Sequence, residues 1–223
     1  MDMADNLGKV KERIARAATR AGRSPGDVTL VAVSKMVDAA RVAEAVRLGI
    51  TDIGENWVQE AQPKIQVLEA QGLKPTWHMV GHLQTNKVKA ALRLFDVIQS
   101  VDSLHLAETL SRQATRTVRV LVEVNVAGEA TKTGFKPEET SGAVERLRAL
   151  PNLEVMGLMT VAPLAADPEQ VRPIFRTLRR MAQELGLRHL SMGMTDDFEV
   201  AIEEGATIVR IGRAIFGEHK EEK

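Results

Sequence analysis

Short apolar runs alternate with helical stretches eight times along this chain of 223 residues, and this repeat constrains the fold more than any other feature. Most of the runs are almost continuously apolar, which is typical of parallel strands covered on both faces. The eight predicted strands span residues 28–34, 52–54, 77–83, 97–101, 119–126, 154–160, 189–194 and 207–211. We therefore expect an α/β fold, a single (β/α)8 TIM-type barrel with an extra N-terminal helix over about residues 6–21.

The residues that flank the predicted helices are typical helix ends. Asp38 and Ser103 are N-cap residues, Pro137 is a first-turn proline, and Gly49 follows a helix over 39–48. An open doubly wound sheet is the alternative, but the first strand-to-helix turn over 33–37 lacks the glycines of a dinucleotide-binding loop. With no linker or low-complexity tract, we expect one domain over 1–223, with frayed tails over 1–5 and 218–223.

Composition excludes several classes of function. Lys and Arg total 30 and Asp and Glu total 30, so a formal net charge of zero gives no footprint for nucleic acid or for an anionic membrane. The absence of cysteine excludes a disulfide framework, a Cys-ligated zinc and a thiol nucleophile. No signal peptide and no apolar run of membrane-spanning length is present, so we expect a cytoplasmic protein.

A lysine lies at the carboxyl end of the first predicted strand, where barrels carry their active sites. Lys35 follows Val31 and Val33 at a period of two, so all three side chains are predicted to face the barrel interior. A desolvated amine at this place would be nucleophilic toward aldehydes. The alternative is a structural salt bridge from Lys35 to Glu55 or another acid at the rim.

An anion site is predicted at the loops after the seventh and eighth strands, where barrels commonly hold phosphate. Thr195 offers a hydroxyl, and a helix predicted to start at Thr195 or Asp196 offers backbone N–H groups. Gly212 lets the backbone approach a ligand closely, and Arg213 follows it. Alternatively, Thr195 is a helix cap, Gly212 a turn and Arg213 a solvated charge. Their coincidence opposite Lys35 favours a phosphate-bearing aldehyde.

Two other motifs do not predict a metal site or a phosphate-binding loop. His78 and His82 are four residues apart on a predicted strand, and Met79 stands where a metalloprotease helix would need glutamate, so we predict no metal site. Residues 128–134 begin and end with glycine but lack the Lys-Ser/Thr pair of a phosphate-binding loop, and a mobile active-site loop is the better interpretation.

The motifs taken together resemble the pyridoxal phosphate homeostasis proteins, also called YggS-type or proline synthetase co-transcribed proteins. The resemblance runs from about residue 10 to residue 217 and rests on several short motifs in order. These motifs lie at residues 31–35, 54–60, 77–78, 81–87, 157–160, 191–194 and 209–217. It implies a barrel similar to the N-terminal domain of alanine racemase.

The resemblance also implies a cofactor, pyridoxal 5′-phosphate (PLP), and the residues that hold it. By this resemblance Lys35 forms the Schiff base, and Arg210 faces the pyridine nitrogen. Thr195, where the family usually has serine, and the backbone of Gly212 and Arg213 contact the phosphate, and Asn56 lies near the cofactor.

Two positions depart from the family pattern. The family often has threonine at the position of Arg213, which affects a side-chain contact with the phosphate but not a backbone one. Residues 36–38, Met-Val-Asp, replace a stretch that often contains threonine and proline, which affects the shape of the loop after Lys35.

The absence of tyrosine helps to distinguish a protein that only holds the cofactor from an enzyme that converts a substrate. The racemase that the chain resembles uses a tyrosine from a second domain as one of its two bases, and this sequence contains no tyrosine at all. A permanently charged Arg210 at the ring nitrogen would also make the ring a weaker electron sink than an acid would. Lys35 or His82 could still act on one face of a substrate.

Three functions stay open from the sequence. The leading hypothesis is a non-catalytic, monomeric PLP-binding protein that maintains intracellular vitamin B6 balance, with PLP-dependent apo-enzymes as recipients. The alternatives are a PLP-dependent amino-acid racemase or related enzyme, and a Schiff-base aldolase acting on a phosphorylated sugar. The aldolase is disfavoured because such enzymes usually place their lysine on a later strand than Lys35.

Overall fold

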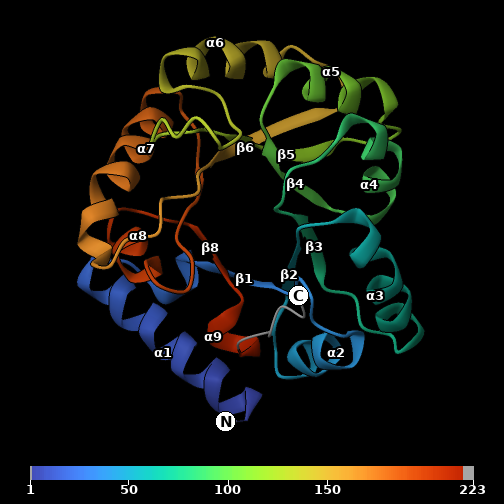
Figure 1. Ribbon diagram of the computed structural model, residues 1–223, viewed down its shortest axis with the longest axis vertical. Coiled ribbons are helices and arrows are strands. Elements are labelled where there is room, and N and C mark those ends of the chain that lie inside the picture. The colour runs from blue at the N-terminus through green and yellow to red at the C-terminus, as the bar shows by residue number, and fades with distance from the viewer. Residues whose placement is uncertain (1, 218–223) are drawn as a thin grey trace.

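The computed structural model describes residues 2–217, and within them eight parallel strands close into a barrel in chain order (Figure 1). Each strand pairs with the next, and the barrel closes where β8 pairs with β1. The strands are β1 (Thr29–Val33), β2 (Asp52–Glu55), β3 (Thr76–Met79), β4 (Val97–Val101), β5 (Val118–Glu123), β6 (Leu153–Met159), β7 (His189–Ser191) and β8 (Ile208–Ile211). The predicted (β/α)8 barrel is confirmed.

The helices form a ring outside the strands, and the extra N-terminal helix α1 packs against α8 and α9 (Figure 1). The helices are α1 (Met3–Arg20), α2 (Ala39–Arg47), α3 (Val58–Ala70), α4 (Val88–Leu94), α5 (Leu104–Gln113), α6 (Pro137–Arg148), α7 (Arg172–Glu184), α8 (Phe198–Glu203) and α9 (Arg213–Phe216). Short 3₁₀ turns lie at Pro25–Asp27, Thr85–Lys87 and Pro168–Val171. Within residues 2–217, no helix combines the length and the apolar character needed to cross a membrane.

The predicted caps begin their helices as expected. The Asp38 carboxylate accepts a hydrogen bond from the backbone N–H of Arg41 at 2.9 Å, and the Ser103 hydroxyl accepts one from Leu106 at 3.3 Å. Pro137 is the first residue of α6. Each cap satisfies a backbone N–H that the helix itself leaves without a partner.

Some predicted boundaries are wrong. α1 begins at Met3, inside the predicted tail over 1–5, and Met3 is 4% exposed because the first turn of the helix packs into the core. The residues 218–223 of the other predicted tail lie outside the described part of the chain. β3 ends at Met79 and β7 at Ser191, each earlier than predicted, because buried apolar residues such as Leu83 and Met192 continue the apolar pattern past the end of the strand.

Two apolar clusters make the core. The larger one fills the layer between the outer faces of the strands and the helices. The smaller one lies inside the barrel and consists of Val31, Val97, Leu121, Met159 and Ile208. The interior of the barrel is thus only partly apolar, because buried polar side chains from several strands share it.

Candidate functional site

A cavity of about 600 Å³ lies where the strands end, and it brings together all six residues that the sequence singled out. Ligand pockets typically measure ~300–1,000 Å³. The cavity is lined by Val33, Lys35, Met36, Asn56, Val80, Val161, Met194, Thr195, Asp196, Arg210, Gly212, Arg213 and Gly217. β1 and β8 are neighbours through closure of the barrel, so residues from the two ends of the chain share one wall.

Lys35 has no acidic partner within the described residues, because the carboxylate proposed for it is engaged elsewhere. Glu55 pairs with the buried Lys64 of α3, at 2.6 Å from Nζ to Oε1. The predicted alternative, a Lys35–Glu55 salt bridge, is therefore wrong. An amine that lines a cavity without an acidic partner is available to a ligand carbonyl.

The two residues that flank Lys35 are fixed by side chains of the next strand and helix. Lys64 donates to the backbone carbonyl of Ser34 at 2.7 Å, and the Ser34 hydroxyl donates to Glu55. On the other side, the Glu60 carboxylate accepts from the backbone N–H of Met36 at 2.9 Å. Met36 has a φ of 59°, an unusual conformation for a residue with a side chain, and the Glu60 contact helps to hold it. The loop around Lys35 is therefore pre-formed.

Burial raises the pKa of Glu55, although hydrogen bonds from Lys64 and Ser34 act in the opposite direction. Its second oxygen, Oε2, is buried without a hydrogen-bond partner in the described part of the chain. Lys64 is thus the main group that compensates a buried carboxylate directly beneath the Lys35 loop.

The predicted anion site lies at the loops after β7 and β8, but its helix starts later than expected. α8 begins at Phe198, and Thr195 belongs to a preceding turn in which the Asp197 carboxylate accepts from the backbone N–H of Met194 at 2.6 Å. Gly193, with a φ of 94°, starts this turn, and a Cβ there would lie 2.6 Å from the Cβ of Ala201. The Thr195 hydroxyl therefore lines the cavity from a turn and not from a helix start.

At the end of β8, Gly212 and Arg213 complete this wall. A Cβ on Gly212 would lie 2.9 Å from the backbone oxygen of Val33, so the backbone here needs glycine to sit so close to β1. Arg213 is not a freely solvated charge: it pairs with both carboxylate oxygens of Asp196, at 2.6 and 2.7 Å. Asp196 thus partly neutralises the cation next to the expected phosphate position.

Arg210 is the one deeply buried cation of the cavity, with 4% of its surface exposed. Its guanidinium donates to the Ser191 hydroxyl at 2.6 Å and to the backbone oxygen of Thr160 at 2.8 Å. Burial lowers its pKa to about 10, and the charges of Glu123 and Asp197 partly offset this. Arg210 therefore stays protonated at neutral pH and offers hydrogen-bond donors but no acceptor.

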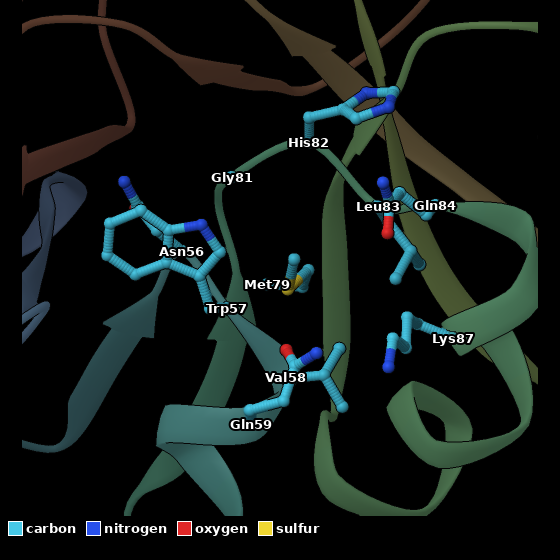
Figure 2. A pocket seen from close by; sticks show the side chains of 10 residues that line it. All are labelled: Asn56, Trp57, Val58, Gln59, Met79, Gly81, His82, Leu83, Gln84 and Lys87. Carbon is cyan, nitrogen blue, oxygen red and sulfur yellow. The ribbon is translucent and has the colours of Figure 1, made fainter.

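A second, smaller cavity of about 270 Å³ adjoins the first and shares Asn56 with it (Figure 2). Trp57 and Gln59 line it from the start of α3, and Lys87 lines it from the opposite side. His82 belongs to this second cavity, where its ring is half-exposed and bonds Asp102 at 2.7 Å. His82 therefore does not line the cavity that contains Lys35.

His78 and His82 do not converge on a common point. The nitrogens of His78 bond Asp52 and Gln99, whereas His82 bonds Asp102. Among residues 2–217, no group of three or more His, Asp or Glu side chains is arranged to hold a metal ion.

The loop over 128–134 is fastened at the mouth of the barrel. The Asn125 side chain donates to the backbone oxygen of Glu129 at 2.8 Å, and the Thr133 hydroxyl donates to Glu123 at 2.9 Å. Burial raises the pKa of Glu123, which lies at the end of β5. The expected mobility of this loop stays a prediction.

Sequence reasoning missed the residues that support the site rather than line it. Lys64 lies inside a helical pattern in which a lysine normally points to solvent, and Gln99 lies in a short strand that reads as apolar. The one available signal was the motif over 54–60, in which Glu55 was considered only as a partner of Lys35 and Glu60 had no assigned role.

Comparison with known proteins identifies the family. Residues 6–220 match the family model described as alanine racemase, N-terminal domain. The chain is 45% identical to the pyridoxal phosphate homeostasis protein of Aquifex aeolicus, covering 99% of this chain and 100% of that protein. It is 40% identical to the protein of the same name from Escherichia coli, covering 97% and 96% respectively.

Solved structures agree with this family. The structure of PipY from Synechococcus elongatus with PLP bound matches with a TM-score of 0.84 and 34% identity, covering 97% of this chain and 100% of that chain. Alanine racemase from Corynebacterium glutamicum matches with a TM-score of 0.72 and 20% identity over 97% of this chain and 62% of that one, which indicates a shared fold. The chain belongs to the alanine racemase N-terminal domain family and, within it, to the pyridoxal phosphate homeostasis proteins.

Proposed function

We propose that this chain binds PLP through a Schiff base on Lys35 and holds it, without turning over a substrate, for intracellular vitamin B6 homeostasis. The observation that carries the proposal is the cavity of about 600 Å³ that all six residues predicted from the sequence line together. The relatives named above support it, because full-length matches carry this name and PipY has PLP bound.

The lining residues fit each part of PLP. The Lys35 amine suits the aldehyde, and the buried Arg210 guanidinium suits the pyridine nitrogen, to which it can only donate. The Thr195 hydroxyl, the glycine backbone at 212 and Arg213 suit the phosphate. Asn56 lies between this cavity and its neighbour, where it can contact the ring. When bound, PLP supplies an electrophilic aldehyde and a conjugated ring.

Holding is favoured over turnover by the titratable groups of the cavity. Within the described residues they are Lys35, Asp196, Arg210 and Arg213, and Asp196 is paired with Arg213. A racemase needs a base on each face of its substrate, and among the described residues that line this cavity Lys35 is the one basic side chain without a hydrogen-bond or ion-pair partner. We accordingly propose that transfer of PLP to apo-enzymes, and not chemistry on an amino acid, is the role of the bound cofactor.

Chemical trapping tests the binding site. Borohydride reduction of the protein loaded with PLP should fix the cofactor to the peptide that contains Lys35, as measured by mass spectrometry. Lys35→Ala should lose the adduct, and Lys87→Ala, in the neighbouring cavity, should retain it. An adduct on a different lysine, or none in the parent protein, would show the assignment to be wrong.

Isotope exchange separates the carrier from an enzyme. The loaded protein is incubated in deuterated water with each of the common amino acids, and exchange of the α-proton is followed by NMR. We expect no exchange above that of free PLP. Exchange at enzymatic turnover rates would instead support the racemase alternative.

A further inference from the structure

A continuous column of hydrogen bonds crosses the interior of the barrel, beside its apolar cluster. Arg210 donates to Ser191 Oγ at 2.6 Å, and Ser191 Oγ donates to Gln99 Oε1 at 2.6 Å. The Gln99 amide nitrogen bonds His78 Nδ1 at 2.9 Å, and His78 Nε2 bonds Asp52 Oδ1 at 2.9 Å. These five side chains come from five different strands, and Asp52 is the first residue of β2. The column therefore runs from the cavity that contains Lys35 to the opposite end of the barrel.

The bonds of this column all point the same way. Arg210 can only donate, and the Gln99 amide nitrogen can only donate to His78 Nδ1. With the amide nitrogen as donor, His78 Nδ1 is the acceptor, and the Nε2–H donates to Asp52. Hydrogen bonds aligned in this way polarise one another. The Asp52 carboxylate at one end of the column therefore strengthens each hydrogen bond between it and Arg210.

The two ends of the column carry opposite charges in different surroundings. Arg210 is buried at the cavity that contains Lys35. Asp52 lines a separate cavity at the opposite end of the barrel and is partly exposed there. Burial alone would raise the pKa of Asp52, but hydrogen bonds from His78 and Thr51 lower it below its ordinary value. Asp52 is therefore an anion at neutral pH.

Polar side chains buried in a barrel core lose their hydrogen bonds to water and need protein partners to replace them. TIM barrels usually fill this space with branched apolar side chains, and unsatisfied polar groups there are costly. Here Ser191, Gln99 and His78 are buried, and every one of them is satisfied within the column. The column thus takes the place of apolar packing and connects Asp52 to the Arg210 guanidinium, which lines the cavity that contains Lys35.

We propose that Asp52, His78 and Gln99 are positioning residues that hold the Arg210 guanidinium in one orientation and stabilise its charge. The column fixes one nitrogen of Arg210 through Ser191, and the backbone of Thr160 fixes the other. A guanidinium held in this way presents its remaining N–H donors to the cavity. The consequence for the cofactor rests on the proposed function: with PLP bound, a fixed positive charge on Arg210 would disfavour a further positive charge on the ring nitrogen or on the nitrogen of Lys35.

Two variants interrupt the column in different ways. Gln99→Met removes both amide groups at similar length, so Ser191 and His78 lose their connection. Asp52→Asn keeps an oxygen that can accept from His78 and removes only the charge. Glu44→Gln, an exposed acid of α2, is the matched control for loss of a negative charge.

The first measurement needs no cofactor. In the protein without PLP, the side-chain N–H signals of Arg210 are followed by NMR. The parent and Glu44→Gln should show slowly exchanging signals with restricted rotation, and Gln99→Met should lose them. Asp52→Asn, which preserves the shape of the core, should accelerate their exchange several-fold. Unchanged exchange in Asp52→Asn, and in Gln99→Met where it folds by circular dichroism, would overturn the proposal.

The second measurement uses the loaded protein and its visible absorbance as a function of pH. If a held Arg210 disfavours the protonated Schiff base, its release in Gln99→Met should raise the titration midpoint by about 0.5–1 pH unit, and Asp52→Asn should shift it the same way by less. Midpoints equal to that of the parent in both variants, with the Lys35 adduct intact, would refute the role in tuning the cofactor. A parent protein that binds no PLP would instead refute the proposed function and leave the NMR result valid.

Discussion

Replacing Lys64 by methionine tests whether the buried ion pair beneath Lys35 shapes the site. Lys64 is buried and bonds Glu55, the Ser34 carbonyl and, at 3.5 Å, Glu60. Methionine has a similar length and is unbranched, so the variant removes the charge and the donors with little change of volume. Glu55 would then be a buried carboxylate without its compensating cation.

The expected loss of stability follows from the cost of an uncompensated buried charge. Removing one partner of a buried ion pair typically lowers the free energy of unfolding by about 3–5 kcal/mol. At about 1.36 kcal/mol per pKa unit, this corresponds to a further rise of roughly 2–4 units in the pKa of Glu55. The direction agrees with the parent protein, in which burial already raises that pKa above its ordinary value of 4.5.

The pH dependence gives this prediction its sign. An acid whose pKa is higher in the folded state binds its proton more tightly there, so its contribution favours folding below the unfolded pKa and is lost as pH rises through the folded pKa. The Lys64→Met protein should therefore be close to the parent near pH 5 and lose stability progressively toward pH 8. Urea unfolding at several pH values, followed by circular dichroism, measures this difference.

Two further variants make the result decisive. Adding Glu55→Gln to Lys64→Met should restore much of the stability at pH 8, because the remaining side chain is neutral. Lys89→Met, an exposed lysine of α4, should change little. A loss that is equal at pH 5 and pH 8, and that the double variant does not recover, would refute the electrostatic explanation and indicate lost packing instead.

Three other substitutions follow from local geometry. Gly212→Ala would place a Cβ 2.9 Å from the backbone oxygen of Val33, so it should weaken PLP binding and lower stability by about 1–3 kcal/mol, measured by absorbance titration and urea unfolding. Asp38→Ala removes the acceptor for the N–H of Arg41 and should lower the unfolding free energy by about 1 kcal/mol. Gly142→Ala, within α6 and with no atom near the new Cβ, should raise it by about 0.5–1 kcal/mol; a loss there would contradict the helix assignment.

The barrel was predictable because its signals are local and repeated. Apolar runs of strand length, caps such as Asp38 and first-turn prolines such as Pro137 each act within a few residues of the chain. Ends of strands were less predictable, since buried apolar residues in the loops after β3 and β7, such as Leu83 and Met192, continue the apolar pattern. The late start of α8 depends on Gly193 and on the carboxylate of Asp197, and that contact has no signature in spacing alone.

The lining residues of the site were predictable for a different reason from the residues behind them. A resemblance names positions such as Lys35 and Arg210, and the barrel topology then places them on adjacent strands. The support of these residues depends on partners that sequence distance hides: Ser191 and Gln99 are 92 positions apart and bond at 2.6 Å. Such pairs become visible only when the barrel closes.

Closure of the barrel also determines which residues support the site. Lys35 is fixed through its neighbours by Lys64 and Glu60, and Arg210 is fixed by a column that starts at the far end of the barrel. Neither support uses a side chain of residues 36–38 or of Arg213, the positions that depart from the family pattern. The one contact at Met36 uses its backbone N–H, which any residue other than proline supplies. The departures should therefore alter the affinity for PLP more than the geometry of the Lys35 amine.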